Sequence, residues 1–391
     1  MSSLEAAVSD LEDPRVWPTA PAADAGVARL HVIAAAGLDA GTTREEDARR
    51  DEARQALEVL MRSGDGRCLA SVLADAPSLP VARYLWRLLE TTETDRAAST
   101  AVLSTTLFAI PVAVVAGLAE EGGRATLPGV LRQPEALAQL LREHRALGGC
   151  ETFVLSGSLA GVDAIDLPRL PSLLAVGRLG DEPDAAPLPP LDLPAADLDL
   201  QGAGERVFLR FVVGAAVTAP GFDPLRAGDV GTWGMPFSQM LGSGLAMPGA
   251  SVLALPRPPQ RLVAALRTGR AAQREVGAQI FASNAIRKLR ASVGEPTAII
   301  SAHRAADAAG GGELRVSLSS PFEPRDAEGF RCPVYPYETV QTVAAMLVSL
   351  LVDCRVGDIR IEPGVHADVD ATTGLRLLFK DTGRSDSAAL H

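Results

Sequence analysis

The residues best suited to chemistry in this 391-residue chain are one imidazole and two carboxylates in the segment 359–370, IRIEPGVHADVD. Polar residues take the even positions of this segment, and most odd positions are aliphatic. Because successive side chains of a strand point to opposite faces, His366, Asp368 and Asp370 are predicted to share one face. Such a set could bind a hard or borderline cation, or transfer protons. The competing interpretation is the solvated face of a one-sided antiparallel hairpin, which produces the same alternation.

A second imidazole, His303, ends the predicted strand 297–303, TAIISAH. The glycine-rich loop DAAGGG, residues 307–312, connects this strand to the predicted strand 314–319. If the two hairpins repeat one unit, His303 is equivalent to the C-terminal cluster and could complete a site between them. The resulting hypothesis is an enzyme, a metal-assisted hydrolase that acts through the two hairpins.

The familiar catalytic motifs are absent from the sequence. Neither SGSLAG at 156–161 nor LGSGLA at 241–246 has the G-x-S-x-G spacing of a nucleophile elbow. There is no phosphate-binding GxxxxGK[ST] loop and no dinucleotide-binding GxGxxG after a predicted strand. The four cysteines are scattered without the spacing of a zinc site or a disulfide framework. The sequence therefore predicts no cofactor and no assignable metal site.

A glycine- and proline-rich segment, residues 220–259, gathers methionines and aromatic residues. It is predicted to be an irregular loop that carries the candidate partner-binding residues Trp233, Met235, Phe237 and Met240. A flexible loop with such side chains suits a binding surface. The alternative interpretation is an irregular segment that packs over the core.

Residues 256–293 are predicted to form the longest helix. Its apolar residues Leu262, Leu266, Val276 and Ile280 recur at helical spacing and are expected on one face. Apolar residues after position 284 leave this face, which predicts a break in the helix there. Glycine in a helix interior costs about 1 kcal/mol, so Gly269 indicates close packing against a neighbour or a kink.

The same helix is basic in a chain whose net charge is −11. Arg267, Arg270 and Arg274 are expected beside the apolar face and are candidate partner-binding residues. One interpretation is a solvated face whose aliphatic stems cover apolar surface. The other is an anion-binding surface, for the chain's own acidic connector (the proline-rich segment 181–204), for an acidic protein or, last, for nucleic acid.

Composition narrows the class of protein further. A pI near 5.1 argues against a dedicated nucleic-acid-binding protein. The first residues are acidic and unlike a signal peptide, and the longest apolar run, 107–118, is too short for a membrane helix. Only two lysines occur among 37 basic residues, which fits a GC-rich bacterial genome. A bacterial cytoplasmic protein with no membrane association is expected.

The element pattern predicts four regions. Residues 1–100 are mainly helical, with helices at 22–38, 43–73 and 79–90. Residues 101–180 form a small α/β unit with strands at 104–117 and 151–155 around a helix at 134–145. Residues 181–204 are an acidic, proline-rich linker, expected to be extended and solvated, although its leucines could let it lie across a surface. Residues 205–391 form a C-terminal α+β domain.

The predicted fold class is α+β. In the last region the basic helix precedes strands 297–303 and 314–319, and a second helix at 337–354 precedes strands 358–362 and 375–380. The order is an αββ unit used twice, with both helices expected on one face of a sheet.

Three functions remain open from the sequence. The first is a non-enzymatic protein with an assembly, scaffold or adaptor role, which works by forming a homo-oligomer or by docking on another protein. The second is the hydrolase described above. The third, nucleic-acid binding through the basic helix 257–290, fits the acidic composition least.

Overall fold

The computed structural model describes residues 24–63, 66–95, 104–119, 123–165, 167–170, 172–173, 191–202, 204–219, 222–225, 229–292, 295–304, 312–319, 327–335, 337–366 and 379–381. The chain has a mixed α+β fold, as the sequence predicts. Its contacts define two compact units. Unit 1 contains the described residues within 1–57, 68–88 and 271–390, and unit 2 contains those within 58–67 and 89–270. The four regions expected from the sequence stay a prediction.

Unit 2 is built on a long antiparallel pair, β1 (Ser104–Leu118) and β5 (Gly204–Thr218). Both strands are rich in aliphatic residues and largely buried on both faces, which places them at the centre of a sheet. Strand β3 (Phe153–Ala160) pairs with β5, while β6 (Ala250–Pro256) and the short β7 (Gln260–Arg261) pair with β1. Strands β2 (Arg124–Leu127) and β4 (Leu198–Gln201) form a separate two-stranded sheet.

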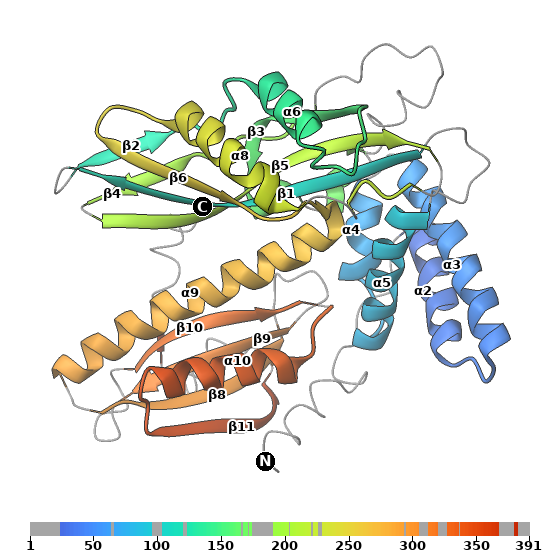
Figure 1. Cartoon of the computed structure of the whole chain (residues 1–391). Coiled ribbons are helices and arrows are strands. Elements are labelled where there is room, and N and C mark those ends of the chain that lie inside the picture. The colour runs from blue at the N-terminus through green and yellow to red at the C-terminus, as the bar shows by residue number, and fades with distance from the viewer. Residues whose placement is uncertain are drawn as a thin grey trace. The chain divides into compact units, whose positions relative to one another are not determined.

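Helices α6 (Pro134–Glu143) and α8 (Val230–Leu245) cover one face of the larger sheet (Figure 1). The even-numbered side chains of β1, from Phe108 to Ala116, point into the core beneath these helices. The prediction of an irregular loop over 220–259 is therefore wrong for most of its length. Asp229 caps α8 by accepting a hydrogen bond from the Gly231 N–H at 2.9 Å.

The local sequence explains why α8 forms despite its glycines and Pro236. Apolar residues recur every fourth position and are buried: Trp233, Phe237, Leu241 and Leu245. On an adjacent side, Gly242 and Gly234 of the helix face β6 at van der Waals distance. A Cβ on Gly242 would lie 3.4 Å from the Val252 carbonyl oxygen, and a Cβ on Gly234 would lie 3.8 Å from Pro256 Cγ.

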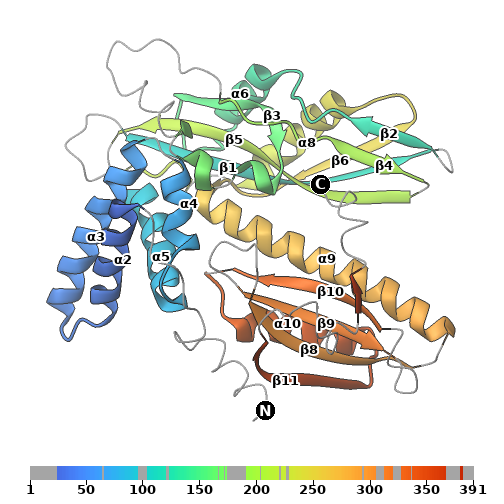
Figure 2. The ribbon, with the colours of Figure 1, turned by 180° about the vertical axis from the view of Figure 1, so that it is seen from behind.

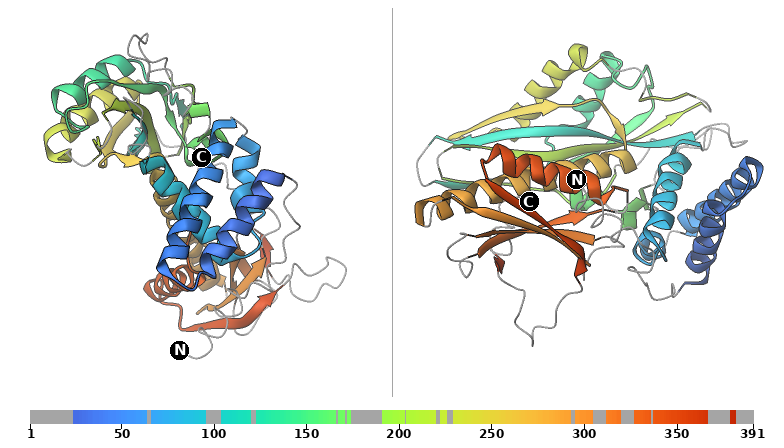
Figure 3. Two further views of the ribbon diagram at one scale, coloured as in Figure 1. Left: turned by 90° about the vertical axis from the view of Figure 1, so that its right-hand side faces the viewer. Right: turned by 90° about the horizontal axis from the view of Figure 1, so that it is seen from below.

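The helical part of the chain comprises α2 (Ala25–Leu38), α3 (Thr43–Ser63), α4 (Gly66–Ala74) and α5 (Leu79–Asp95). Within unit 1 these helices pack side by side (Figure 3). The His31 imidazole of α2 bonds to the Val72 carbonyl oxygen of α4 at 2.9 Å. Among the described residues, every helix falls short of the length and apolar character that crossing a bilayer requires.

The sheet of unit 1 has the order β11-β8-β9-β10-β12. Its strands are β8 (Thr297–Arg304), β9 (Gly312–Ser319), β10 (Ala327–Val334), β11 (Asp358–His366) and β12 (Phe379–Asp381). Helix α10 (Val340–Asp353) covers one face of this sheet. In Figure 2, which shows the molecule from behind, the sheet is nearer the viewer than α10. Strand β10 was not predicted, so three strands rather than two separate the helices. Of the predicted strand 375–380, residues 375–378 lie outside the described part.

Helix α9 (Leu262–Ser292) is continuous, so the predicted break near residue 284 is wrong. Its predicted single apolar face is also wrong. Leu262 and Leu266 are buried, but Val276 and Ile280 are 42% and 45% exposed. The reason is that residues 262–270 pack within unit 2 and residues 271–292 pack within unit 1, through a buried set made of Ala278, Ala282, Ala285, Ile286 and Leu289.

The second half of the acidic connector, residues 191–200, is packed rather than solvated. Its four leucines are buried: Leu191, Leu193, Leu198 and Leu200. The buried Arg210 guanidinium of β5 donates to the carbonyl oxygens of Ala196 and Asp197 at 3.1 and 2.7 Å. The Asp197 carboxylate accepts from the Gly129 N–H at 2.8 Å. Residues 181–190 lie outside the described part.

Candidate docking surface

The face of the unit 2 sheet opposite α6 and α8 is covered along only part of its length. Near the middle of β5, Phe211 is fully buried by the start of α9 and by the short 3-10 helix at Val162–Ile165. The approach is close, because a Cβ on Gly269 would lie 2.6 Å from Phe211 Cζ and 3.2 Å from Val162 Cγ2. The close packing expected at Gly269 is therefore confirmed.

The rest of this face exposes two apolar rows, which we call the open face. Odd-numbered residues of β5, β1 and β6 lie side by side in each row. One row is Val207, Val115 and Leu253, and the other is Leu209, Ala113 and Leu255. Val207, Leu253 and Leu255 are 62%, 51% and 47% exposed, and the other three are partly buried. None of the six residues carries a charge.

Among the described residues of β5, β1 and β6, those that bring charge to this side of the sheet lie at the two ends of the open face. Exposed Glu205 is at the register of Gly117, and exposed Arg257 follows β6 at the register of Pro111. The Arg257 N–H still bonds to the Pro111 carbonyl oxygen at 2.8 Å, so the alternation of the strand continues to this residue. Within the described part of the chain neither side chain forms an ion pair. A hollow of about 410 Å³ at the Glu205 end is lined by Gly117, Leu118, Gly249 and Ser251 as well as Glu205.

The candidate residues of α8 divide into two groups. Trp233 and Phe237 are fully buried and pack edge to face at 5.4 Å, so they stabilise the core and cannot contact a partner. Met235 is 67% exposed. Met240 is half-buried beside Leu241 and contributes to a cavity of about 170 Å³ between α8 and the start of α6.

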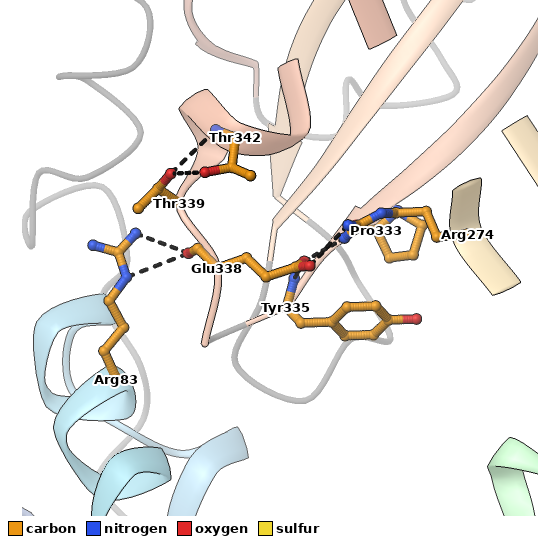
Figure 4. A network of polar contacts seen from close by, with 7 residues as sticks. All are labelled: Arg83, Arg274, Pro333, Tyr335, Glu338, Thr339 and Thr342. Carbon is orange, nitrogen blue, oxygen red and sulfur yellow. Dashed lines mark hydrogen bonds and ion pairs between the residues drawn. The ribbon is translucent and has the colours of Figure 1, made fainter. Parts of the chain in front are cut away.

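The candidate arginines Arg267 and Arg274 on α9 have carboxylate partners within the chain. Arg267 pairs with Glu90 at 2.9 Å, and its side chain is 45% exposed. Arg274 is only 8% exposed and contacts both carboxylate oxygens of Glu338 (Figure 4). Burial opposes its charge, but the hydrogen bond and charge of Glu338 outweigh burial and raise the Arg274 pKa. Arg270 is partly buried.

Glu338 is the centre of a polar network in unit 1 (Figure 4). Arg83 of α5 donates to its backbone carbonyl oxygen at 2.9 and 3.3 Å, while Arg274 of α9 also donates to the Pro333 carbonyl oxygen at 3.1 Å. Thr339, the next residue, caps α10 by accepting from the Thr342 N–H. The network ties two helices to the β10–α10 connection, which gives Arg274 a structural role in place of the predicted partner-binding one.

The structure places the hairpin candidates only in part. His303 lies on the polar face of the unit 1 sheet, where its Nε2 is 2.9 Å from the Ser301 hydroxyl. Its antiparallel register partner, Glu313, forms a buried ion pair with Arg315. The backbone of His366 is at the register of His303 on the adjacent strand. The two C-terminal strands do not form the predicted second hairpin, because β11 pairs in parallel with β8 and β12 pairs in parallel with β10 at opposite edges of the sheet. Asp368 and Asp370 lie outside the described residues.

In the described ranges, no three His, Cys, Asp or Glu residues are grouped as metal ligands. Ser301 and His303 could exchange a proton, but Glu313 is engaged with Arg315. The hydrolase hypothesis stays a prediction.

Sequence reasoning missed the open face because it searched for polar chemistry. The available signal was that apolar residues occupy both alternating sets in ERVFLRFVV of β5 and ASVLALP of β6. A strand with one wet face shows apolar residues in only one set. No protein-family model, no curated protein and no solved structure matches this chain.

Proposed function

We propose that this protein acts by protein–protein association, as an assembly or adaptor component, through the open face of the unit 2 sheet. The observation that carries the proposal is the pair of uncharged rows across β5, β1 and β6, where three large aliphatic side chains are about half exposed. Exposed apolar side chains on adjacent strands cost free energy in water, which their burial by a partner would recover.

The size of the patch supports this role. Three half-exposed and three partly buried side chains present on the order of 300 Å² of apolar surface, comparable to the largest patches of soluble monomers, which are often functional. The same face is closed over Phe211 by elements of the chain itself. The bacterial cytoplasm, expected from the sequence, remains part of the proposal.

Site-specific photo-cross-linking tests the proposal. A photoreactive phenylalanine analogue at position 253, in cells that naturally make the protein, is expected to yield one discrete cross-linked product. Adding Val207→Asp should remove this product, because a charge in the adjacent row opposes burial of the face. The matched control is the analogue at position 352 of α10, where Val352 is 57% exposed outside the open face.

A discrete product at position 253 that survives Val207→Asp, or no product at that position, would contradict the proposal. Mass spectrometry of the product identifies the attached protein as a second copy or as another chain. Either identity supports association through the open face.

A further inference from the structure

We propose that the occupant of the open face is a second copy of this chain, packed face to face with its strands antiparallel to those of the first. This inference rests on the proposed function and names the partner. A two-fold interface uses the same surface on both copies, so the surface must be complementary to itself. Two uncharged rows of Val, Leu and Ala meet this condition, since they bring no like charges together.

The charges at the ends of the open face select the orientation. Glu205 and Arg257 are separated by six residues along β1, from Gly117 to Pro111, which is about 20 Å in a strand, and by two strand spacings, about 10 Å, across the sheet. A two-fold axis that crosses the strands places the Glu205 end of one copy on the Arg257 end of the other. An axis parallel to the strands would instead bring the two Glu205 ends together and the two Arg257 ends together, so that like charges repel.

The hollow at the Glu205 end can receive the arginine of the second copy. It is lined by glycines and a serine and contains one carboxylate, so it has room for a planar guanidinium. Gly249 contributes to this shape with φ of 80°, a conformation that favours glycine. Each copy would supply one arginine and one hollow, giving two equivalent ion pairs.

The buried area predicts a weak dimer. Two patches of on the order of 300 Å² bury about 600 Å² between them, while stable interfaces bury about 1,200–2,000 Å² in total. We expect the dissociation constant of the dimer to be about 10–100 µM. Sedimentation velocity over a concentration series should measure it.

Charge reversal provides the decisive experiment on the full chain. Glu205→Arg alone and Arg257→Glu alone are each expected to weaken dimerisation at least about tenfold, because each homodimer then contains two repulsive contacts. In an equimolar mixture of the two variants, both contacts of the mixed dimer are attractive again. The mixture should therefore recover dimerisation close to that of the wild type.

Both residues are exposed, so unchanged circular dichroism and melting temperature are expected for the variants. Leu253→Asp should abolish dimerisation through the apolar rows and leave no recovery on mixing. A wild-type chain that stays monomeric at about 200 µM, or a mixture no more associated than its components, would overturn the second copy as occupant. The proposed function would still stand if cross-linking at position 253 captured a different protein.

Discussion

Arg267 and Arg274 lie seven residues apart on α9, yet their guanidinium groups have different environments. Arg267 is 45% exposed beside Glu90, whereas Arg274 is 8% exposed between Glu338 and the Pro333 carbonyl oxygen. Exposed ion pairs contribute less than about 1 kcal/mol, since water competes for both charges. Breaking a buried pair costs more, because it leaves a charge with neither water nor a partner.

Replacing Arg274 with methionine is therefore expected to reduce the free energy of unfolding by about 3–5 kcal/mol. Arg267→Met is the matched control on the same helix and should reduce it by less than about 1 kcal/mol. Urea denaturation of the two variants and the wild type measures both changes. Equal small losses for the two variants would mean that Glu338 is stabilised without Arg274.

At the scale of elements, apolar periodicity predicted helices and strands well where it was regular. The strands 297–303, 314–319 and 358–362 correspond to β8, β9 and β11. Helix α8 was missed because its glycines and Pro236 suggested a loop, although burial of one apolar residue per turn outweighs their poor helix propensity. Continuity of α9 was missed because its core-facing side changes where it passes from one unit to the other.

The candidate site was harder to predict than the fold. Which face of β5 and β6 stays open depends on tertiary packing, and no local pattern encodes it. The polar candidate His303 was placed on its strand by alternation, but its contact with Ser301 and the engagement of Glu313 with Arg315 arise from pairing between strands. Position along a strand was predictable, and the neighbours across the sheet were not.

The acidic connector shows how one buried cation can order a segment that composition describes as solvated. Burial lowers the pKa of the Arg210 guanidinium, against the opposing charges of Asp197 and Asp199. Its hydrogen bonds to the Ala196 and Asp197 carbonyl oxygens satisfy backbone groups of the connector.

Arg210→Met is expected to expose this part of the connector to proteolysis, because the two carbonyl oxygens lose their donors and each loss costs about 1–3 kcal/mol. A protease that cleaves after acidic residues should cut the variant at Asp197 and Asp199, and should leave the wild type intact there. Arg206→Met is the matched control, since the Arg206 guanidinium donates to the carbonyl oxygen of exposed Gln201. Cleavage at these sites in the wild type would show that the contacts do not hold the connector.

At the scale of the whole molecule, charge opposes association. Each copy carries a net charge of −11 near neutral pH, so two copies repel each other at long range. The apolar rows act only at contact and must overcome this repulsion. Salt shortens the range of the repulsion to about 8 Å at physiological ionic strength.

Acidification towards the pI near 5.1 should therefore strengthen self-association. In about 20 mM salt, where screening is weak, we expect the dissociation constant of the dimer to be several-fold lower at about pH 5.5 than at about pH 8. Raising salt to about 0.5 M should remove most of this difference, because the repulsion is then screened at both pH values. Sedimentation velocity measures the change, and Leu253→Asp is the control that separates specific pairing from the general loss of solubility near the pI. If Leu253→Asp associates at low pH as strongly as the wild type, the effect does not arise at the open face, and the model of a second copy on that face is wrong.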